Sequence, residues 1–205
     1  MIAKSSLFFK QYLRTTRNAL AVLVSIILLS SCVTALVAGA VIATVDVIHD
    51  RRTVGEYIDD GSIEIKVRNI LVSSREIRSA AHVKPDSWNG ILLVTGEIDQ
   101  ETVKRDIIER FRAIQGVRQV VDETTITGKT TLGTRANDAW ISNKVKGRLV
   151  LKTGLDANRV KVITTRGSVY LMGIVTRDEG EKATELARTV RGVERVVKVF
   201  EYQEG

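Results

Sequence analysis

The sequence predicts an α+β protein with two tandem small domains, each with two helices packed on one face of a three-stranded mixed sheet. The same set of motifs occurs twice along residues 59–205. The apolar periodicity of each copy predicts the order helix, strand, strand, helix, strand. The 205 residues are 44% hydrophobic and 27% charged, with one proline and 15 glycines. This is an ordinary globular composition, which excludes collagen-like and disordered classes.

The duplication is visible as three pairs of matching segments. The pairs are 60–71 with 138–149, 90–96 with 167–173, and 116–121 with 192–197. Their offsets of 78, 77 and 76 indicate small loop changes between two copies of one fold. Two repeats are too few for a solenoid, so each copy is expected to form a small domain of its own.

The first helix of each copy is predicted from apolar residues at helical spacing. These residues are Ile63, Val67, Ile70 and Leu71 in the first copy, and Ile141, Val145 and Leu149 in the second. Asp60, and either Asn137 or Asp138, occupy positions where an N-cap would accept the first free amides. The two helices are therefore expected to begin near these residues.

Three strands and a second helix follow in each copy. Alternating apolar residues predict the first two strands, and the final strands are expected over 117–126 and 193–202. The second helix is expected to begin at Asp99 and at Thr176, where Thr176 and Glu179 form a capping box. Gly116 and Gly192 are expected to end these helices, because glycine adopts the left-handed conformation without steric cost.

The N-terminus has the pattern of a bacterial secretory signal, with an acid-free basic segment before the uncharged apolar run 19–29. Residues 29–32, Leu-Ser-Ser-Cys, resemble the lipobox of bacterial lipoproteins, in which the cysteine is acylated and becomes the mature N-terminus. Cys32 is therefore the predicted lipidation site. Two alternatives are a structural or reactive cysteine and a signal-anchor helix over residues 19–45. The small residues of 35–43 argue against the helix.

Cleavage before Cys32 changes the charge and the expected location. It removes four basic residues and no acid, which lowers the net charge from +7 to +3. In lipoproteins of this kind a residue other than aspartate after the cysteine, here Val33, implies sorting to the outer membrane. Three acyl chains would hold the protein at the periplasmic face of that membrane, where nucleic acid is not a routine partner.

The expected organisation of the chain follows from these boundaries. It comprises a signal peptide (1–31), a lipid anchor and tether (32–58), a first domain (59–127), a linker (128–136) and a second domain (137–205).

The first helix of the second copy carries an unusual face beside its predicted core face. Trp140, Lys144, Gly147 and Leu151 fall together on it at about 100° per residue. Their counterparts in the first copy are all polar: Ser62, Lys66, Asn69 and Ser73. A shared core does not explain this difference, so an external contact is expected. Tryptophan beside lysine is typical of a membrane interface.

The charge distribution favours the same surface. Residues 59–127 hold 10 basic and 12 acidic residues, whereas 137–205 hold 13 and 9. No acid lies within 140–152, and each base near an anionic bilayer contributes about 1 kcal/mol, so phosphatidylglycerol or cardiolipin is the expected partner. The alternative is a solvated helix with Trp140 packed against the first copy or the linker. The candidate lipid-binding residues are Trp140, Lys144, Lys146, Gly147, Arg148, Val150, Leu151, Lys152 and Leu155.

The paired units resemble BON domains over residues 59–203. The resemblance rests on the Gly-x-Val-x-Leu-x-Gly hairpin of 167–173 and the Gly-Val-x-x-Val segments that begin at Gly116 and Gly192. It implies a protein without enzymatic activity that binds phospholipid and supports envelope integrity. By this resemblance, the first helix of the second domain and the loop after it form the lipid-contact region. The apolar stretch 33–45 and the charged residues 50–52 are departures whose role the resemblance does not explain.

Other candidate sites are less convincing. His49 and His82 lack neighbouring ligands at metal-binding spacing, and no cofactor is expected. A helix start accounts for the Asp59-Asp60 pair, which lacks a general-acid partner, and Trp88 is expected to serve packing. No catalytic set is present, so an enzyme is not expected. The alternative function is a periplasmic adaptor that docks onto outer-membrane assembly or peptidoglycan-remodelling machinery through Trp140.

Overall fold

The computed structural model describes residues 51–128, 131–153 and 159–204, all of which belong to one compact unit, His49–Gly205. The predicted cleavage site, Cys32, Val33 and His49 lie outside the described residues, as does Leu155.

The first copy folds as α2 (Val54–Val72), α3 (Arg75–Ala80), β1 (Ala81–Trp88), β2 (Ile91–Ile98), α4 (Glu101–Arg112) and β3 (Gln119–Ile126). Strand β2 lies in the centre of the sheet, antiparallel to β1 and parallel to β3. The short helix α3 was not predicted. Its N-cap is Ser74, whose hydroxyl accepts a hydrogen bond from the amide of Ile77.

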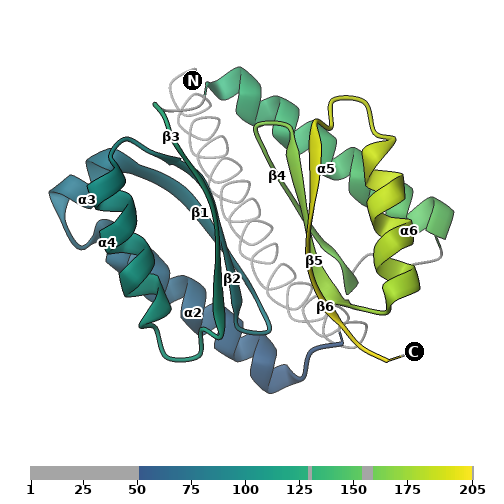
Figure 1. The fold of residues 1–205 in the computed structure, drawn as a ribbon, viewed down its shortest axis with the longest axis horizontal. Helices are drawn as coiled ribbons and strands as arrows, with labels where there is room; N and C mark the ends of the chain where they lie inside the picture. Colours follow the sequence, from purple (N-terminus) through teal and green to yellow (C-terminus); the bar gives the residue numbers. More distant parts are fainter. Residues whose placement is uncertain (1–50, 129–130, 154–158, 205) are drawn as a thin grey trace, which may run out of the picture. The chain divides into compact units, whose positions relative to one another are not determined.

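The second copy repeats this topology with α5 (Leu132–Thr153), β4 (Lys161–Thr165), β5 (Ser168–Val175), α6 (Arg177–Arg188) and β6 (Arg195–Tyr202). Strand β5 is central, antiparallel to β4 and parallel to β6. In each copy the helices cover one side of the sheet (Figure 1). The predicted α+β class, the mixed three-stranded sheets and the order of elements are therefore confirmed.

The first helices begin earlier than predicted. Thr53 is the N-cap of α2, and it forms a capping box with Glu56: each side chain accepts a hydrogen bond from the other's backbone amide. Helix α5 begins at Leu132, within the segment expected to be a linker. The predicted N-caps were wrong, because both helices begin before them. The residues concerned lie inside the helices: Asp60, Asn137 and Asp138.

The second helices match the prediction more closely at their starts than at their ends. Helix α4 begins at Glu101, and the capping box of Thr176 and Glu179 is confirmed at the start of α6. Both helices end four residues before Gly116 and Gly192, so these glycines do not end them directly. With φ angles of 100° and 95°, they turn the chain toward the last strand.

Each copy has a hydrophobic core between its helices and its sheet. In the first copy Ile63 and Val67 of α2 are buried with Phe111 of α4. In the second copy Ile141 and Val145 of α5 are buried together with apolar residues of the sheet and of α6. The apolar faces predicted for the first helices are therefore the faces that pack in the core.

A third core joins the two sheets. Because side chains alternate along a strand, Leu92 and Val94 of β2 face the helices while Leu93 faces the other way. There it packs with residues of both copies: Trp88, Tyr170, Met172 and Val199. The sheets thus pack face to face, as in a β-sandwich. Each copy therefore has a core of its own, as expected for two small domains, and shares this third core with the other copy.

Ion pairs surround the shared core and connect the copies. The shortest nitrogen–oxygen distances are 2.7 Å for Arg195–Glu123, 2.8 Å for Lys161–Asp86 and 3.1 Å for Arg118–Glu201. Most of these side chains are partly exposed, so each pair contributes modestly to stability. Each of them joins a residue of one copy to a residue of the other.

Candidate functional site

Helix α5 presents one buried face and one exposed face. Ile141, Val145 and Leu149 are at most 1% exposed and form the buried face. Trp140 is 45% exposed and Leu151 is 85% exposed, on the other side of the helix. Trp140 and Leu151 therefore lie away from the core residues of α5, as predicted.

The exposed face is apolar along its centre and basic along its edges. Trp140, Gly147 and Leu151 lie on the side of the helix opposite its core residues, given 100° per residue. Lys144 and Lys146 are both exposed and lie on opposite edges. The Lys144 ammonium lies 4.9 Å from the centre of the Trp140 ring, which is within the range of a cation–π contact.

The remaining candidates on this helix differ in their surroundings. Val150 is exposed, whereas Arg148 donates hydrogen bonds of 2.9 Å to the carbonyl and the hydroxyl of Thr189 just after α6. Arg148 thus holds the end of α5 against the end of α6. Lys152 belongs to the last turn of α5, but its side chain is outside the described part of the structure, as is Leu155.

A buried carboxylate fixes α5 two residues before Trp140. Asp138 accepts hydrogen bonds from the amides of Arg166 and Gly167, at 2.9 and 3.0 Å. These residues form the tight turn between β4 and β5, with φ angles of 49° and 73°. Asp138 therefore orients the helix that presents Trp140.

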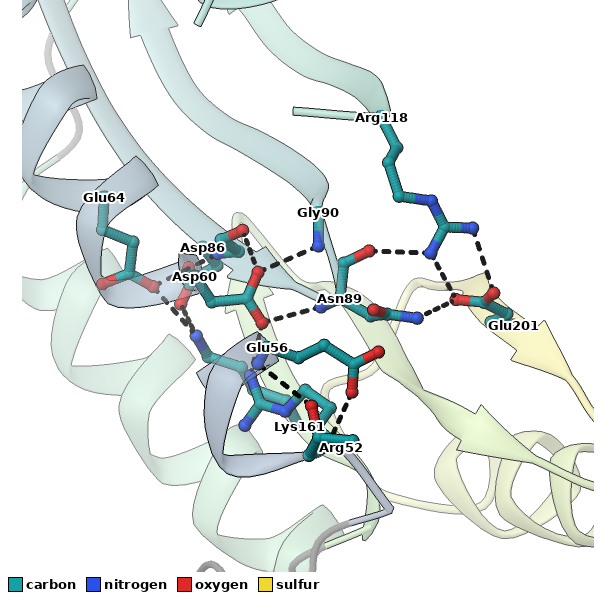
Figure 2. Close-up of polar contacts among 12 residues, drawn as sticks. Arg52, Glu56, Asp60, Glu64, Asp86, Asn89, Gly90, Arg118, Lys161 and Glu201 are labelled. Atoms are coloured by element: carbon teal, nitrogen blue, oxygen red, sulfur yellow. Dashed lines mark hydrogen bonds and ion pairs between the residues drawn. The ribbon is translucent and has the colours of Figure 1, made fainter. Parts of the chain in front are cut away.

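Asp60 has the same role in the first copy (Figure 2). It accepts hydrogen bonds from the amides of Asn89 and Gly90, in the equivalent turn, and from the hydroxyl of Ser87. It also pairs with Arg52 at 2.7 Å. The two aspartates that were predicted as N-caps are thus clamps between the first helix and the first turn of each sheet.

The charged segment before α2 is tied to both copies. Arg51 forms an ion pair of 2.7 Å with Glu179 of α6. Arg52 pairs with Asp60, and its guanidinium lies 3.7 Å from the centre of the Trp88 ring. Trp88 is 6% exposed, so the prediction that it serves packing is confirmed.

The counterparts on α2 differ from the α5 face in their pairing. The ammonium of Lys66 donates to the carbonyl of Gln115 at 3.3 Å, and the hydroxyl of Ser73 donates to the carbonyl of Ile70. The comparison of the two copies in the sequence missed a line of exposed apolar residues elsewhere on α2: Val54, Ile58, Ile65 and Val72. Their spacing of four and seven residues was the signal that could have identified them.

His82 lies beside a polar cavity of about 200 Å³ that Lys84 and Glu97 also line. Its Nε2 atom is buried without a hydrogen-bond partner in the structure. Among the described residues, no group of three or more His, Cys, Asp or Glu side chains is arranged to hold a metal ion. In the same part of the chain, no helix is both long and apolar enough to cross a bilayer.

Comparison with known proteins identifies both copies. The family model for the BON domain matches residues 59–128 and 137–204. The outer membrane lipoprotein DolP of Haemophilus influenzae is 33% identical over 176 residues, which cover 86% of this chain and 91% of DolP.

Two further relatives align over most of their length. The 21 kDa hemolysin of Actinobacillus pleuropneumoniae is 29% identical, over 75% of this chain and 79% of the hemolysin. The osmotically-inducible protein Y of Escherichia coli is 26% identical, over 70% of this chain and 72% of that protein. The chain therefore belongs to the BON-domain family and is a protein of two BON domains similar to DolP.

Proposed function

We propose that this protein is a non-enzymatic lipoprotein of the outer membrane that binds anionic phospholipid through the exposed face of α5. Its similarity to an outer membrane lipoprotein along 86% of the chain supports the location. The lipobox-like sequence before Cys32 supports acylation of that cysteine. The anchor would place both BON domains at the periplasmic surface of the membrane.

One observation carries the lipid proposal: a half-exposed tryptophan lies between two exposed lysines on a helix segment without acids. The indole of Trp140 suits the headgroup region, because its ring is apolar and its N–H is polar. Lys144 and Lys146 lie on the two edges of the face, where their stems can follow the apolar surface while their charges reach phosphates. Leu151 would enter the acyl boundary beside Trp140.

Electrostatics favours an anionic lipid over a neutral one. The segment 140–152 carries four basic residues and no acid. Arg148 is engaged with Thr189, so Lys144 and Lys146 are the described cations free to meet headgroups. At about 1 kcal/mol for each base near an anionic surface, the pair supplies about 2 kcal/mol of attraction. This attraction is absent for phosphatidylcholine.

A vesicle experiment tests the proposal. Residues 49–205, which form a compact unit, are sedimented with vesicles of phosphatidylcholine alone or with added phosphatidylglycerol. We expect binding that rises with the phosphatidylglycerol content and weakens with salt. Binding that ignores lipid composition, or its absence, would contradict the proposal and favour a protein adaptor instead.

A further inference from the structure

The turn between α6 and β6 runs alongside α5, next to the edge of the exposed face that carries Lys144. The guanidinium of Arg148 donates two hydrogen bonds of 2.9 Å to Thr189, at the start of this turn. At its end Gly192 packs on Ile141, because a Cβ added to the glycine would lie 3.1 Å from the Cδ1 atom of Ile141. Lys144 lies between Ile141 and Arg148 along the helix, one turn before Arg148 on the same side. The turn therefore flanks Lys144.

The first copy shows how closely this turn approaches the lysine of the first helix. Lys66 is the counterpart of Lys144, 78 residues before it. Its ammonium donates a hydrogen bond of 3.3 Å to the carbonyl of Gln115, which is the counterpart of Arg191, 76 residues before it. In the second copy the Lys144 ammonium lies over the Trp140 ring instead. Since the two copies share one fold, position 191 is within reach of the Lys144 side chain.

The bases on this edge have no acidic partner in the described part of the chain. Lys144 contacts the Trp140 ring, and Arg148 binds the neutral Thr189, so neither charge is paired with a carboxylate. Arg191 is exposed, and its side chain forms no hydrogen bond or ion pair with any described residue. Residues 139–152 and 186–193 contain no acid. Like charges held close together repel one another, so an anion bound between them is stabilised.

This concentration of charge belongs to the second copy alone. The counterparts of Arg148, Thr189 and Arg191 are uncharged: Ile70, Ala113 and Gln115. Gly116 nevertheless packs on Ile63 in the first copy as Gly192 packs on Ile141 in the second. The fold therefore does not require an arginine at position 148 or 191, and a ligand of the second copy accounts for both.

We infer that Lys144 and Arg191 form a phosphate site, which holds the headgroup phosphate of the anionic phospholipid at the face of α5. Arg148 holds the turn in place and adds its charge. The inference rests on the proposed function, and it adds a contact from outside α5. Arginine suits a phosphate because its guanidinium offers parallel N–H groups to two oxygens. The site lies beside Trp140, whose ring would enter the membrane interface next to the bound phosphate.

Vesicle cosedimentation of residues 49–205 tests the site with Arg191→Gln. Glutamine occupies this position in the first copy, so the substitution suits the turn. We expect the variant to bind vesicles that contain phosphatidylglycerol at least about fivefold more weakly than the wild type, which is the contribution of one base near an anionic surface. Its unfolding in urea should be unchanged, because Arg191 is exposed.

Arg177→Gln is the matched control. It removes the same charge from an exposed arginine at the other end of α6, about 17 Å along the helix from Arg188. We expect it to weaken binding by less than about twofold, because salt screens a charge at that distance from the site. Equal losses for Arg177→Gln and Arg191→Gln would overturn the inference, because net charge alone would then explain both.

A double-mutant cycle tests whether Lys144 and Arg191 hold the same phosphate. If they do, Lys144→Gln has little left to remove once Arg191→Gln is present. The double variant should then bind more tightly than the product of the two single losses predicts. Losses that multiply would show two independent bases on a charged surface and would overturn the shared site.

NMR of the arginine side chains separates a lipid headgroup from free phosphate. The Nε–H signal of Arg191 is identified by its absence in Arg191→Gln. It is followed while short-chain phosphatidylglycerol micelles or inorganic phosphate are added at matched ionic strength. We expect the micelles to shift this signal and inorganic phosphate at low millimolar concentration to leave it in place. An equal shift with inorganic phosphate would assign the site to a soluble anion and overturn the lipid assignment.

Failure of this inference differs from failure of the proposed function. Arg191→Gln that binds phosphatidylglycerol vesicles as the wild type does, while Trp140→Ala binds weakly, would overturn the phosphate site and leave the α5 face as the lipid contact. A wild type that ignores phosphatidylglycerol would contradict both.

Discussion

Asp60 and Arg52 form an ion pair of 2.7 Å in which both side chains are less than one tenth exposed. The same carboxylate accepts hydrogen bonds from the amides of Asn89 and Gly90 in the turn between β1 and β2. Loss of one partner of a buried pair is costly because the other charge stays desolvated. We expect Asp60→Ala to lower the free energy of unfolding, measured in urea, by about 3–5 kcal/mol.

Two aspartates provide the comparison. Asp138→Ala should cost less, about 1–3 kcal/mol, because it removes hydrogen bonds to the amides of Arg166 and Gly167. Asp59 is exposed, and Asp59→Ala should change the stability by no more than about 0.5 kcal/mol. Equal losses for Asp59→Ala and Asp60→Ala would mean that the clamp does not stabilise the fold.

The elements and their buried faces could be predicted because helical periodicity is a local property of the sequence. Ile141, Val145 and Leu149 are spaced for one face of a helix, and all three are buried. Because the two copies share one pattern, a single predicted topology had to account for both of them, and this extended the prediction to the whole fold. The start of α2 was misplaced although Thr53 and Glu56 have the spacing of a capping box.

The shared core could not be predicted from the sequence of either copy. Leu92, Leu93 and Val94 form a continuous apolar run, which indicates a strand buried on both faces. Nothing in that run specifies that the second face packs against the other copy. Sheet packing depends on residues as distant as Leu93 and Met172, whereas periodicity reports only on neighbours.

The shared core leads to a prediction about unfolding. Leu93 and Met172 are fully buried and lie in the cluster that both copies form, so Leu93→Ala should cost about 2–5 kcal/mol and destabilise both copies. The comparison position is Ile107, which is equally buried but lies in the core of the first copy alone. Calorimetry should show one transition for the wild type. A second-copy transition that Leu93→Ala leaves unshifted would contradict coupling through this core.

Glu201 should contribute to a loss of stability in acid. Burial raises its pKa, but hydrogen bonds from Arg118 and Asn89 outweigh burial, so the pKa lies below its ordinary value of 4.5. A carboxylate with a lowered folded-state pKa stabilises the fold above its unfolded-state pKa, and this stabilisation is lost as the pH falls through the folded-state value. We expect Glu201→Gln to flatten the decline in unfolding free energy below about pH 4.5. An unchanged pH profile would show that the carboxylate charge is not involved.

Acylation is tested at Cys32. Cys32→Ala should abolish attachment of radiolabelled palmitate and leave the precursor uncleaved at Ser31, because lipobox processing requires the cysteine thiol. Electrophoresis of whole-cell extracts separates the precursor from the mature form. A mutant that still matures with label attached would show that another residue carries the lipid.

The lipid proposal predicts a difference between the two first helices. Trp140→Ala and Lys144→Glu should each weaken binding to vesicles that contain phosphatidylglycerol, because they remove the two side chains that meet at 4.9 Å on the exposed face. Lysine to glutamate changes two charges, so we expect about 2 kcal/mol, or about thirtyfold, at low salt and less at high salt. Vesicle cosedimentation of residues 49–205 measures both losses.

The matched changes on α2 are the controls for this difference. Ser62→Ala and Lys66→Glu should do little, because Lys66 faces the carbonyl of Gln115 and lies among acids such as Asp59 and Glu64, whereas the segment 140–152 of α5 has none. The fold of each variant is checked by its unfolding free energy, which Trp140→Ala should leave almost unchanged, since the residue is 45% exposed. Equal losses of binding from both helices would refute the assignment of lipid contact to the second domain. An unfolded Trp140→Ala variant would instead show that Trp140 stabilises the fold, and the face of α5 would lose its main evidence for a partner.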